Sequence, residues 1–139
     1  MKIISLDIGD KWTGIALSDQ LGILARPYDT VQTAQLLQQL ELIFAKEPIA
    51  IAVVGLPTTL RGTHSEQTKK VIAFAQDLEK AFPTLTWTLW DERLTSKQAA
   101  SLKSTRTKQE KLQSHAIAAA LILSGYLESR RFAQQSEDD

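Results

Sequence analysis

The apolar run from Ile49 to Val54 constrains the fold more than any other segment of this chain. It contains no polar residue, and it is followed by Gly55 and Pro57, which end a strand. A continuous apolar run of this length is typical of a strand that is covered by helices on both faces. It is also far shorter than the roughly 20 residues that span a bilayer. The run therefore predicts the interior strand of an α/β sheet.

The flanking segments extend that sheet. Residues 2–8 and 13–18 have strand composition on either side of a turn at residues 9–11, and residues 22–28 predict a third strand of the same meander. Residues 85–90 alternate as a strand does. The expected fold is α/β, with a five-stranded mixed sheet in which three antiparallel strands are followed by parallel crossovers, and with helices on both faces.

The helices are predicted from apolar spacing and from capping boxes, in which a Ser or Thr precedes a Glu or Gln by three residues. Apolar spacing predicts helices over residues 33–45 and from about residue 114 to 132. A capping box of Thr63 with Glu66 begins a further helix, which ends near Pro83, and one of Thr95 with Gln98 begins a short helix.

Length and composition limit what this chain can be. Its 139 residues suit a single domain, expected over residues 1–133, with an acidic tail at 134–139 that frays. Cysteine is absent, which excludes disulfides and thiolate sites. Sixteen basic residues balance sixteen acidic ones, so nucleic-acid binding would need local patches. Asp7 interrupts any signal-peptide core, so we expect a cytoplasmic protein that is not bound to membranes.

Acidic side chains stand at the ends of two predicted strands. Sheets of this kind bind ligands beyond the carboxyl ends of their parallel strands, so Asp7 should meet Asp91 and Glu92 there. Two carboxylates at one sheet edge favour Mg²⁺ or Mn²⁺, which prefer oxygen ligands. The alternatives are that Asp7 caps the following turn and that the acidic pair partners Arg93. Strand alternation points only one member of that pair into the crevice.

His115 is the third candidate. A helix that begins near Ser114 would place it in the first turn, facing inward, where a core or capping role is the alternative. Basic and hydroxyl side chains near these acids are candidate contacts for a phosphate backbone, although a solvated charge run is the commoner explanation of such a patch. These candidates are Lys11, Arg61, Thr63, Arg93, Lys97, Lys103, Arg106 and Lys108.

Four motifs occur in order along the chain, namely LDIGDKWTGIALSD, VVGLP with the later RGTHSEQ, DERLTS, and AIAAALILSGYL. Together they resemble the bacterial YqgF-type family of pre-16S rRNA nucleases, which are also described as Holliday-junction-resolvase-like proteins. The similarity covers nearly the whole chain. It implies a ribonuclease H-like fold and metal-dependent hydrolysis of phosphodiester bonds in the cytoplasm. The implied role is maturation of the 5′ end of small-subunit ribosomal RNA.

The resemblance also suggests roles for single residues. Asp7 matches the first-strand acid, and Glu92 matches the acid of the DER motif. Trp12 replaces the usual arginine of the first motif, and His115 replaces the acid expected before the paired alanines of the last helix. Related resolvase folds use histidine near that position, so His115 could ligate a metal or orient the attacking water. Losing one negative charge predicts weaker Mg²⁺ binding and a preference for Mn²⁺.

Three other functions compete with this one. A protein of the same fold that lacks a metal ligand could bind RNA or the ribosome without cleaving it. A resolvase of branched DNA would need a dimer with two matched sites, and the sequence leaves the oligomeric state open. The pattern of Asp7, Gly9 and Gly14 also resembles the phosphate loop of actin-like ATPases, but one domain cannot build their two-domain clamp.

Overall fold

The structure is a computed structural model that describes residues 1–57, 65–92 and 108–138. Its elements are β1 (Lys2–Ile8), β2 (Trp12–Ser18), β3 (Ala25–Gln32), the 3-10 helix η1 (Thr33–Gln35), α1 (Leu36–Lys46), β4 (Ile49–Leu56), α2 (Glu66–Ala81), β5 (Thr86–Asp91) and α4 (Lys108–Asp138). The sheet has the order β3-β2-β1-β4-β5. β1 pairs antiparallel with β2, and β2 with β3, whereas β1 with β4 and β4 with β5 are parallel. This topology confirms the predicted five-stranded mixed sheet.

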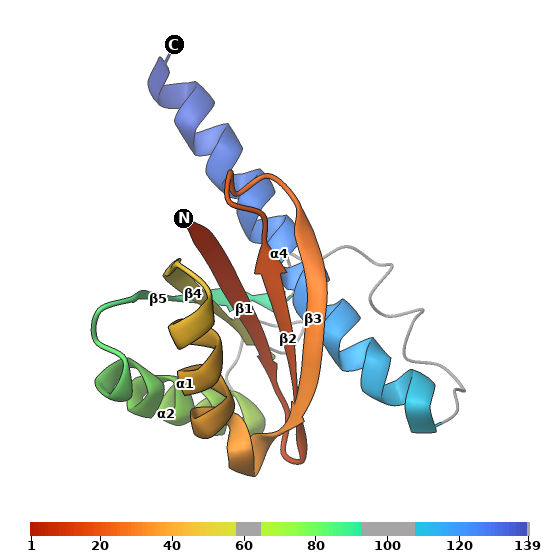
Figure 1. Ribbon diagram of the computed structural model, residues 1–139. Helices are drawn as coiled ribbons and strands as arrows, with labels where there is room; N and C mark the ends of the chain where they lie inside the picture. The colour runs from red at the N-terminus through yellow and green to blue at the C-terminus, as the bar shows by residue number, and fades with distance from the viewer. Residues whose placement is uncertain (58–64, 93–107, 139) are drawn as a thin grey trace.

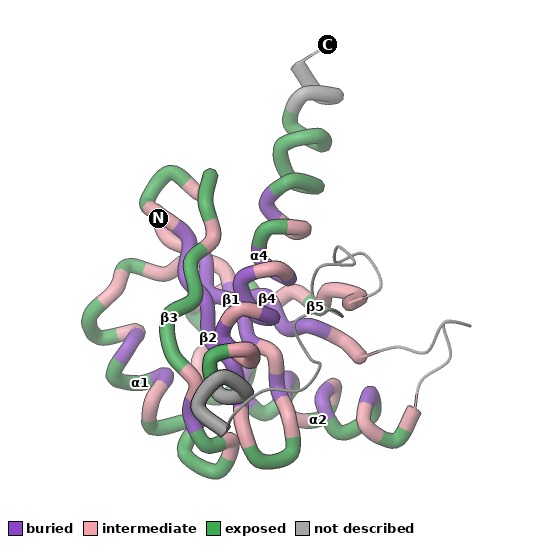
Figure 2. Tube along the Cα trace, turned by 90° about the vertical axis from the view of Figure 1, so that its right-hand side faces the viewer, coloured by how far each residue is buried: buried purple, intermediate pink, exposed green. Residues whose placement is uncertain are grey.

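Helices cover both faces of the sheet, as Figure 1 shows. One apolar core lies between the sheet and helices α1 and α2, and a second lies between the sheet and α4. Side chains of β1 alternate between these cores, with Ile4 and Leu6 in the first and Ile3 in the second. The strands β1, β2 and β4 are accordingly the most buried part of Figure 2. None of the described helices is long and apolar enough to cross a membrane.

β4 behaves as its sequence predicts. Ala52, Val53 and Val54 are fully buried. Val53 packs toward α4, while its neighbours pack toward the opposite face, so the strand needs apolar residues on both sides. The interpretation of the run from Ile49 to Val54 as an interior strand is therefore confirmed.

The predicted third strand of the meander exists, but its predicted bounds, residues 22–28, are wrong, because β3 covers Ala25–Gln32. The reason is a loop organised by Asp19, whose Oδ1 accepts hydrogen bonds from the backbone N–H groups of Ile23 at 2.7 Å and Leu24 at 3.0 Å. These bonds hold the pKa of the Asp19 carboxyl below its usual value, with the bond from Leu24 contributing most. Gly22 adopts a positive φ of 69°, which the loop requires.

The start of α2 also differs from the prediction. Its N-cap is Ser65 rather than Thr63, because the Ser65 side chain accepts a hydrogen bond from the Thr68 backbone N–H at 3.2 Å. Thr63 itself and the capping box predicted at Thr95 lie outside the described residues.

The last helix is longer at both ends than predicted. It was expected from about residue 114 to 132, yet α4 extends over Lys108–Asp138 and includes most of the segment that was expected to be a tail. Apolar residues do not recur at helical spacing in residues 108–113 and 133–138, so periodicity does not predict a helix in these two segments. These segments are rich in Lys, Gln, Glu and Ala and contain no Pro or Gly, so their helix propensity continues the helix.

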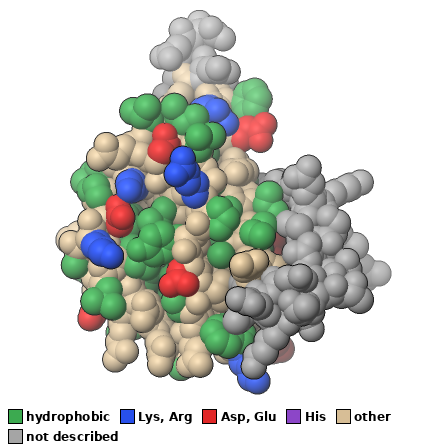
Figure 3. Space-filling view, turned by 45° about the vertical axis from the view of Figure 1, so that its right-hand side comes forward, with side chains coloured by type: hydrophobic (Ala, Val, Ile, Leu, Met, Phe, Trp, Pro, Cys, Tyr) green, Lys and Arg blue, Asp and Glu red, His purple; other side chains and the backbone are tan. Residues whose placement is uncertain are grey.

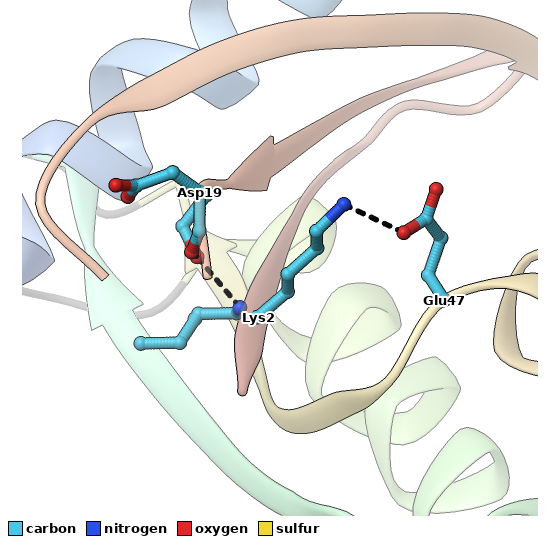
Figure 4. A network of polar contacts seen from close by, with 5 residues as sticks. Lys2, Asp19 and Glu47 are labelled. Atoms are coloured by element: carbon cyan, nitrogen blue, oxygen red, sulfur yellow. Dashed lines mark hydrogen bonds and ion pairs between the residues drawn. The ribbon is translucent and has the colours of Figure 1, made fainter. Parts of the chain in front are cut away.

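An ion pair connects the start of β1 to the end of α1. Lys2 Nζ lies 2.7 Å from Glu47 Oε2, and both side chains are largely shielded from solvent (Figure 4). The Lys2 backbone N–H also donates to the Pro48 carbonyl at 2.9 Å. An ion pair near the surface contributes only about 0–1 kcal/mol, so burial of the sheet remains the main source of stability.

Candidate active site

Asp7, Glu92 and His115 line one crevice of about 370 Å³ at the carboxyl ends of the parallel strands. They come from three distant parts of the sequence, since Asp7 is in β1, Glu92 directly follows β5 and His115 is in α4. Of the acidic pair, Glu92 lines this crevice, and Asp91 is not among the described residues of its wall. The structure thus brings the three sequence candidates together at the expected edge of the sheet.

The Asp7 side chain is available to a ligand. It is partly buried, and it makes no hydrogen bond or ion pair within the described parts of the chain. The alternative that Asp7 caps the following turn is wrong, because the Gly9 N–H donates instead to the Trp12 carbonyl at 3.0 Å. Thr33 holds the same turn through a hydrogen bond from its Oγ1 to the Gly9 carbonyl at 2.7 Å. A partly desolvated carboxylate without a protein partner is a suitable ligand for a cation.

Gly55 leaves room for the Glu92 side chain. A Cβ atom at Gly55 would lie 3.3 Å from Glu92 Oε1 and 2.6 Å from Ile122 Cδ1 of α4. Any larger residue would therefore displace the end of the Ile122 side chain and crowd the carboxylate. The glycine that ends the apolar run in the sequence also shapes the crevice.

Gly14 determines where His115 lies. It pairs with Asp7 across the β1–β2 ladder, and a Cβ atom at Gly14 would collide with the backbone carbonyl of His115. The backbone of α4 thus lies directly against β2 at the level of Asp7. One turn farther along, the buried Ser5 hydroxyl donates to the Ala119 carbonyl at 2.6 Å. These two contacts fix the position of α4 along the sheet.

His115 lies in the interior of its helix and not in the first turn. α4 begins at Lys108, seven residues earlier, which excludes the alternative that His115 caps the helix. The side chain is partly exposed and makes no hydrogen bond or ion pair among the described residues. Both Asp7 and His115 therefore face the crevice with free polar atoms.

The donor chemistry of the crevice fits a hard divalent cation, because two carboxylates and an imidazole share one wall. The described ranges of the chain contain no group of three or more Asp, Glu or His side chains already gathered closely enough to hold a metal. Asp7 and Glu92 thus supply suitable oxygen donors without forming a closed cluster.

Gln67 is a crevice residue that sequence reasoning missed. It lies in the first turn of α2, and its side chain lines the crevice opposite α4. The position of that turn is fixed because the buried Thr68 hydroxyl donates to the carbonyl of Pro57 at the end of β4. Nothing within the RGTHSEQ motif distinguishes this glutamine from a surface residue, so only the tertiary contact identifies it.

Two of the predicted phosphate contacts, Lys11 and Lys108, lie within the described residues. Lys11 lines a separate hollow beside Trp12 and Gln32. Lys108 is the first residue of α4. On the face seen in Figure 3, the described basic side chains are interspersed with acidic ones. Five of the candidates lie outside the described residues, together with the hydroxyl of Thr63: Arg61, Arg93, Lys97, Lys103 and Arg106.

The two tryptophans of β5 contribute to packing, as their alternation in the strand predicted. Trp90 packs edge to face against Tyr126 of α4, with the ring centroids 5.9 Å apart. The Trp87 indole N–H donates to the Phe82 carbonyl at 3.0 Å. Both rings are partly buried and pack against the apolar cores, Trp87 on one face of the sheet and Trp90 on the other.

Comparison with known proteins identifies the family. A family model described as "RuvX: Holliday junction resolvase" matches residues 1–129. The chain belongs to the RuvX family. A relative from Rubrobacter xylanophilus is 37% identical over 128 residues, which cover 91% of this chain and 92% of that protein. One from Bacteroides thetaiotaomicron is 39% identical over 137 residues, covering 94% and 99%. Both carry the name "Putative pre-16S rRNA nuclease".

Solved structures share the fold of this RuvX-family chain. Thermus thermophilus RuvC in complex with a Holliday junction superposes with a TM-score of 0.57 at 14% identity, covering 93% of this chain and 96% of RuvC. The fowlpox virus resolvase, also bound to Holliday junction DNA, gives a TM-score of 0.53 at 13% identity, covering 93% and 98%. The ribonuclease H-like fold is therefore confirmed, and the family supports a nuclease, a hydrolase that acts on nucleic acid.

Gly14→Ala tests the contact between α4 and β2. The added methyl group must push α4 away from Asp7, which we expect to lower the free energy of unfolding by about 2–3 kcal/mol and to reduce nuclease activity. Ser5→Ala is the comparison, because it removes a hydrogen bond worth about 1 kcal/mol without adding volume. Denaturant unfolding measures both changes. If Gly14→Ala were as stable and active as the wild type, α4 would not depend on this close approach.

Proposed function

We propose that this protein is a metal-dependent nuclease that hydrolyses phosphodiester bonds during 5′-end maturation of pre-16S ribosomal RNA in the cytoplasm. The observation that carries the proposal is the crevice in which Asp7, Glu92 and His115 meet. The names of the curated relatives support RNA as the substrate.

In this mechanism Asp7 and Glu92 would hold Mg²⁺ or Mn²⁺, and His115 would be a third ligand or would orient the attacking water. A bound divalent cation polarises the phosphate and lowers the pKa of a coordinated water. The Asp7 carboxylate is suited to its role because no protein group competes for it in the described structure. Gly55 gives Glu92 the room to reach the same crevice. The contact at Gly14 keeps His115 beside them.

Branched DNA is the second candidate substrate. The family description and the two resolvase complexes support it, since both solved proteins hold Holliday junctions. A junction resolvase cuts two strands symmetrically and would require a dimer of this chain. A third possibility is an RNA-binding protein of the same fold that does not cleave. A cleavage assay on both substrates separates these three functions.

Asp7→Asn is expected to abolish RNA cleavage, because it removes the charge that binds the cation while conserving the shape of the side chain. The assay uses a 5′-extended small-subunit rRNA precursor and a four-way DNA junction with Mn²⁺. Glu41→Gln is the control, since Glu41 is an exposed acid of α1 that lines neither this crevice nor the hollow beside it. Cleavage of the junction alone would favour the resolvase. RNA binding without cleavage of either substrate would favour the non-catalytic protein.

His115→Asp restores the acid that the family motif leads us to expect. The added negative charge should strengthen Mg²⁺ binding, so we expect the ratio of Mg²⁺-supported to Mn²⁺-supported cleavage to rise about ten-fold or more. Titrating each metal at fixed RNA concentration measures this ratio. An unchanged ratio would show that His115 does not contribute to metal choice.

A further inference from the structure

A second hollow of about 420 Å³ adjoins the candidate active site. Ile8, Gly9 and Gln67 line both, so the two hollows are neighbours across the end of β1. The second hollow extends from there along α2, past Lys70 and Phe74, while Asp10 closes the opposite side. A substrate strand cut beside Asp7 would have to leave the crevice on some side, and this hollow adjoins one side of it.

The lining of the second hollow is chemically mixed. Lys70 is exposed and makes no ion pair among the described residues, so its ammonium group can meet an anion. Val71 and Phe74 give the hollow an apolar floor, and the partly exposed Phe74 offers an aromatic ring. Asp10 and Asp77 add two carboxylates, which accept hydrogen bonds from hydroxyl and amino groups. Such a lining suits a ligand that carries hydroxyl and amino donors as well as one anionic group, because two carboxylates accompany the lysine.

A single unstacked nucleotide matches all of these features. Its phosphate pairs with a lysine, its base packs on an aromatic ring, and its ribose and base carry the donors that carboxylates accept. Sequence-tolerant recognition of single-stranded RNA uses this combination of stacking and backbone charge. We infer that the hollow lined by Gln67, Lys70 and Phe74 binds the nucleotide next to the scissile phosphate, so that the enzyme requires an unpaired nucleotide there. The inference rests on the proposed nuclease function.

Gln67 connects the two hollows. It is partly buried, and its side-chain amide makes no hydrogen bond within the described residues. An amide can donate to a phosphate oxygen and accept from a ribose hydroxyl. Gln67 is therefore placed to contact the backbone between the cleaved bond and the bound nucleotide.

The chain supplies a matched pair of variants for the test. Lys70 lines the hollow, whereas the adjacent Lys69 does not. The Lys69 Nζ lies 3.6 Å from Glu66 Oε1 instead, and both side chains are exposed. We expect Lys70→Ala to weaken binding of single-stranded RNA about five-fold at 0.1 M monovalent salt and to reduce the salt slope of log K by about 0.7. Lys69→Ala should change neither. Fluorescence anisotropy of a labelled 12-nucleotide RNA, with each lysine variant in the Asp7→Asn background, measures binding without cleavage.

A second arm of the experiment tests whether the hollow binds the base of that nucleotide. A series of RNAs with one abasic position moved along the strand should show at least about a five-fold loss of affinity when the gap adjoins the cleavage site. Phe74→Leu keeps the apolar packing of α2 and should remove that sensitivity. The inference is overturned if Lys70→Ala behaves as Lys69→Ala does, or if no abasic position matters.

The two proposals can fail separately. If the wild type cleaves RNA but both arms give the overturning result, the nuclease function stands and the hollow has no role in binding. If both arms give the expected result but the wild type cleaves nothing, the hollow binds nucleotides and the proposed nuclease function fails.

Discussion

The close contact between α4 and β2 at Gly14 is the constraint on which the candidate site depends. A helix backbone can lie directly on a strand only where the strand has no side chain, and Gly14 supplies that gap opposite Asp7. The hydrogen bond from Ser5 to the Ala119 carbonyl fixes the helix one turn farther along. Two residues with no catalytic chemistry of their own thus place His115 beside the carboxylates.

Two carboxylates from distant parts of the sequence line the crevice. Asp7 is partly buried and has no partner among the described residues, and Glu92 stands over Gly55 from the end of β5. Within the described residues a ligand can therefore reach the Asp7 carboxylate without displacing a protein partner, which is why the proposed cation site includes Asp7.

The sequence predicted those features that local patterns determine. The apolar run at β4, the alternation of β5 and the spacing of α1 identify the sheet and its covering helices, because burial leaves a periodic signal. Some predicted bounds differ from the structure. Before β3, Asp19 organises a loop whose composition resembles that of a strand, and at the start of α2 the N-cap is Ser65 rather than Thr63. The roles of Gly14 and Gln67 could not be predicted, since both arise from contacts between elements far apart in the chain.

The measurement that tests this account most directly is anomalous X-ray scattering from crystals of the protein soaked in Mn²⁺. The account predicts a manganese peak within coordination distance of both Asp7 and Glu92, and its loss in Asp7→Asn crystals. Binding of the ion elsewhere, or no peak at a Mn²⁺ concentration that supports cleavage, would contradict the claim that this crevice is the catalytic metal site.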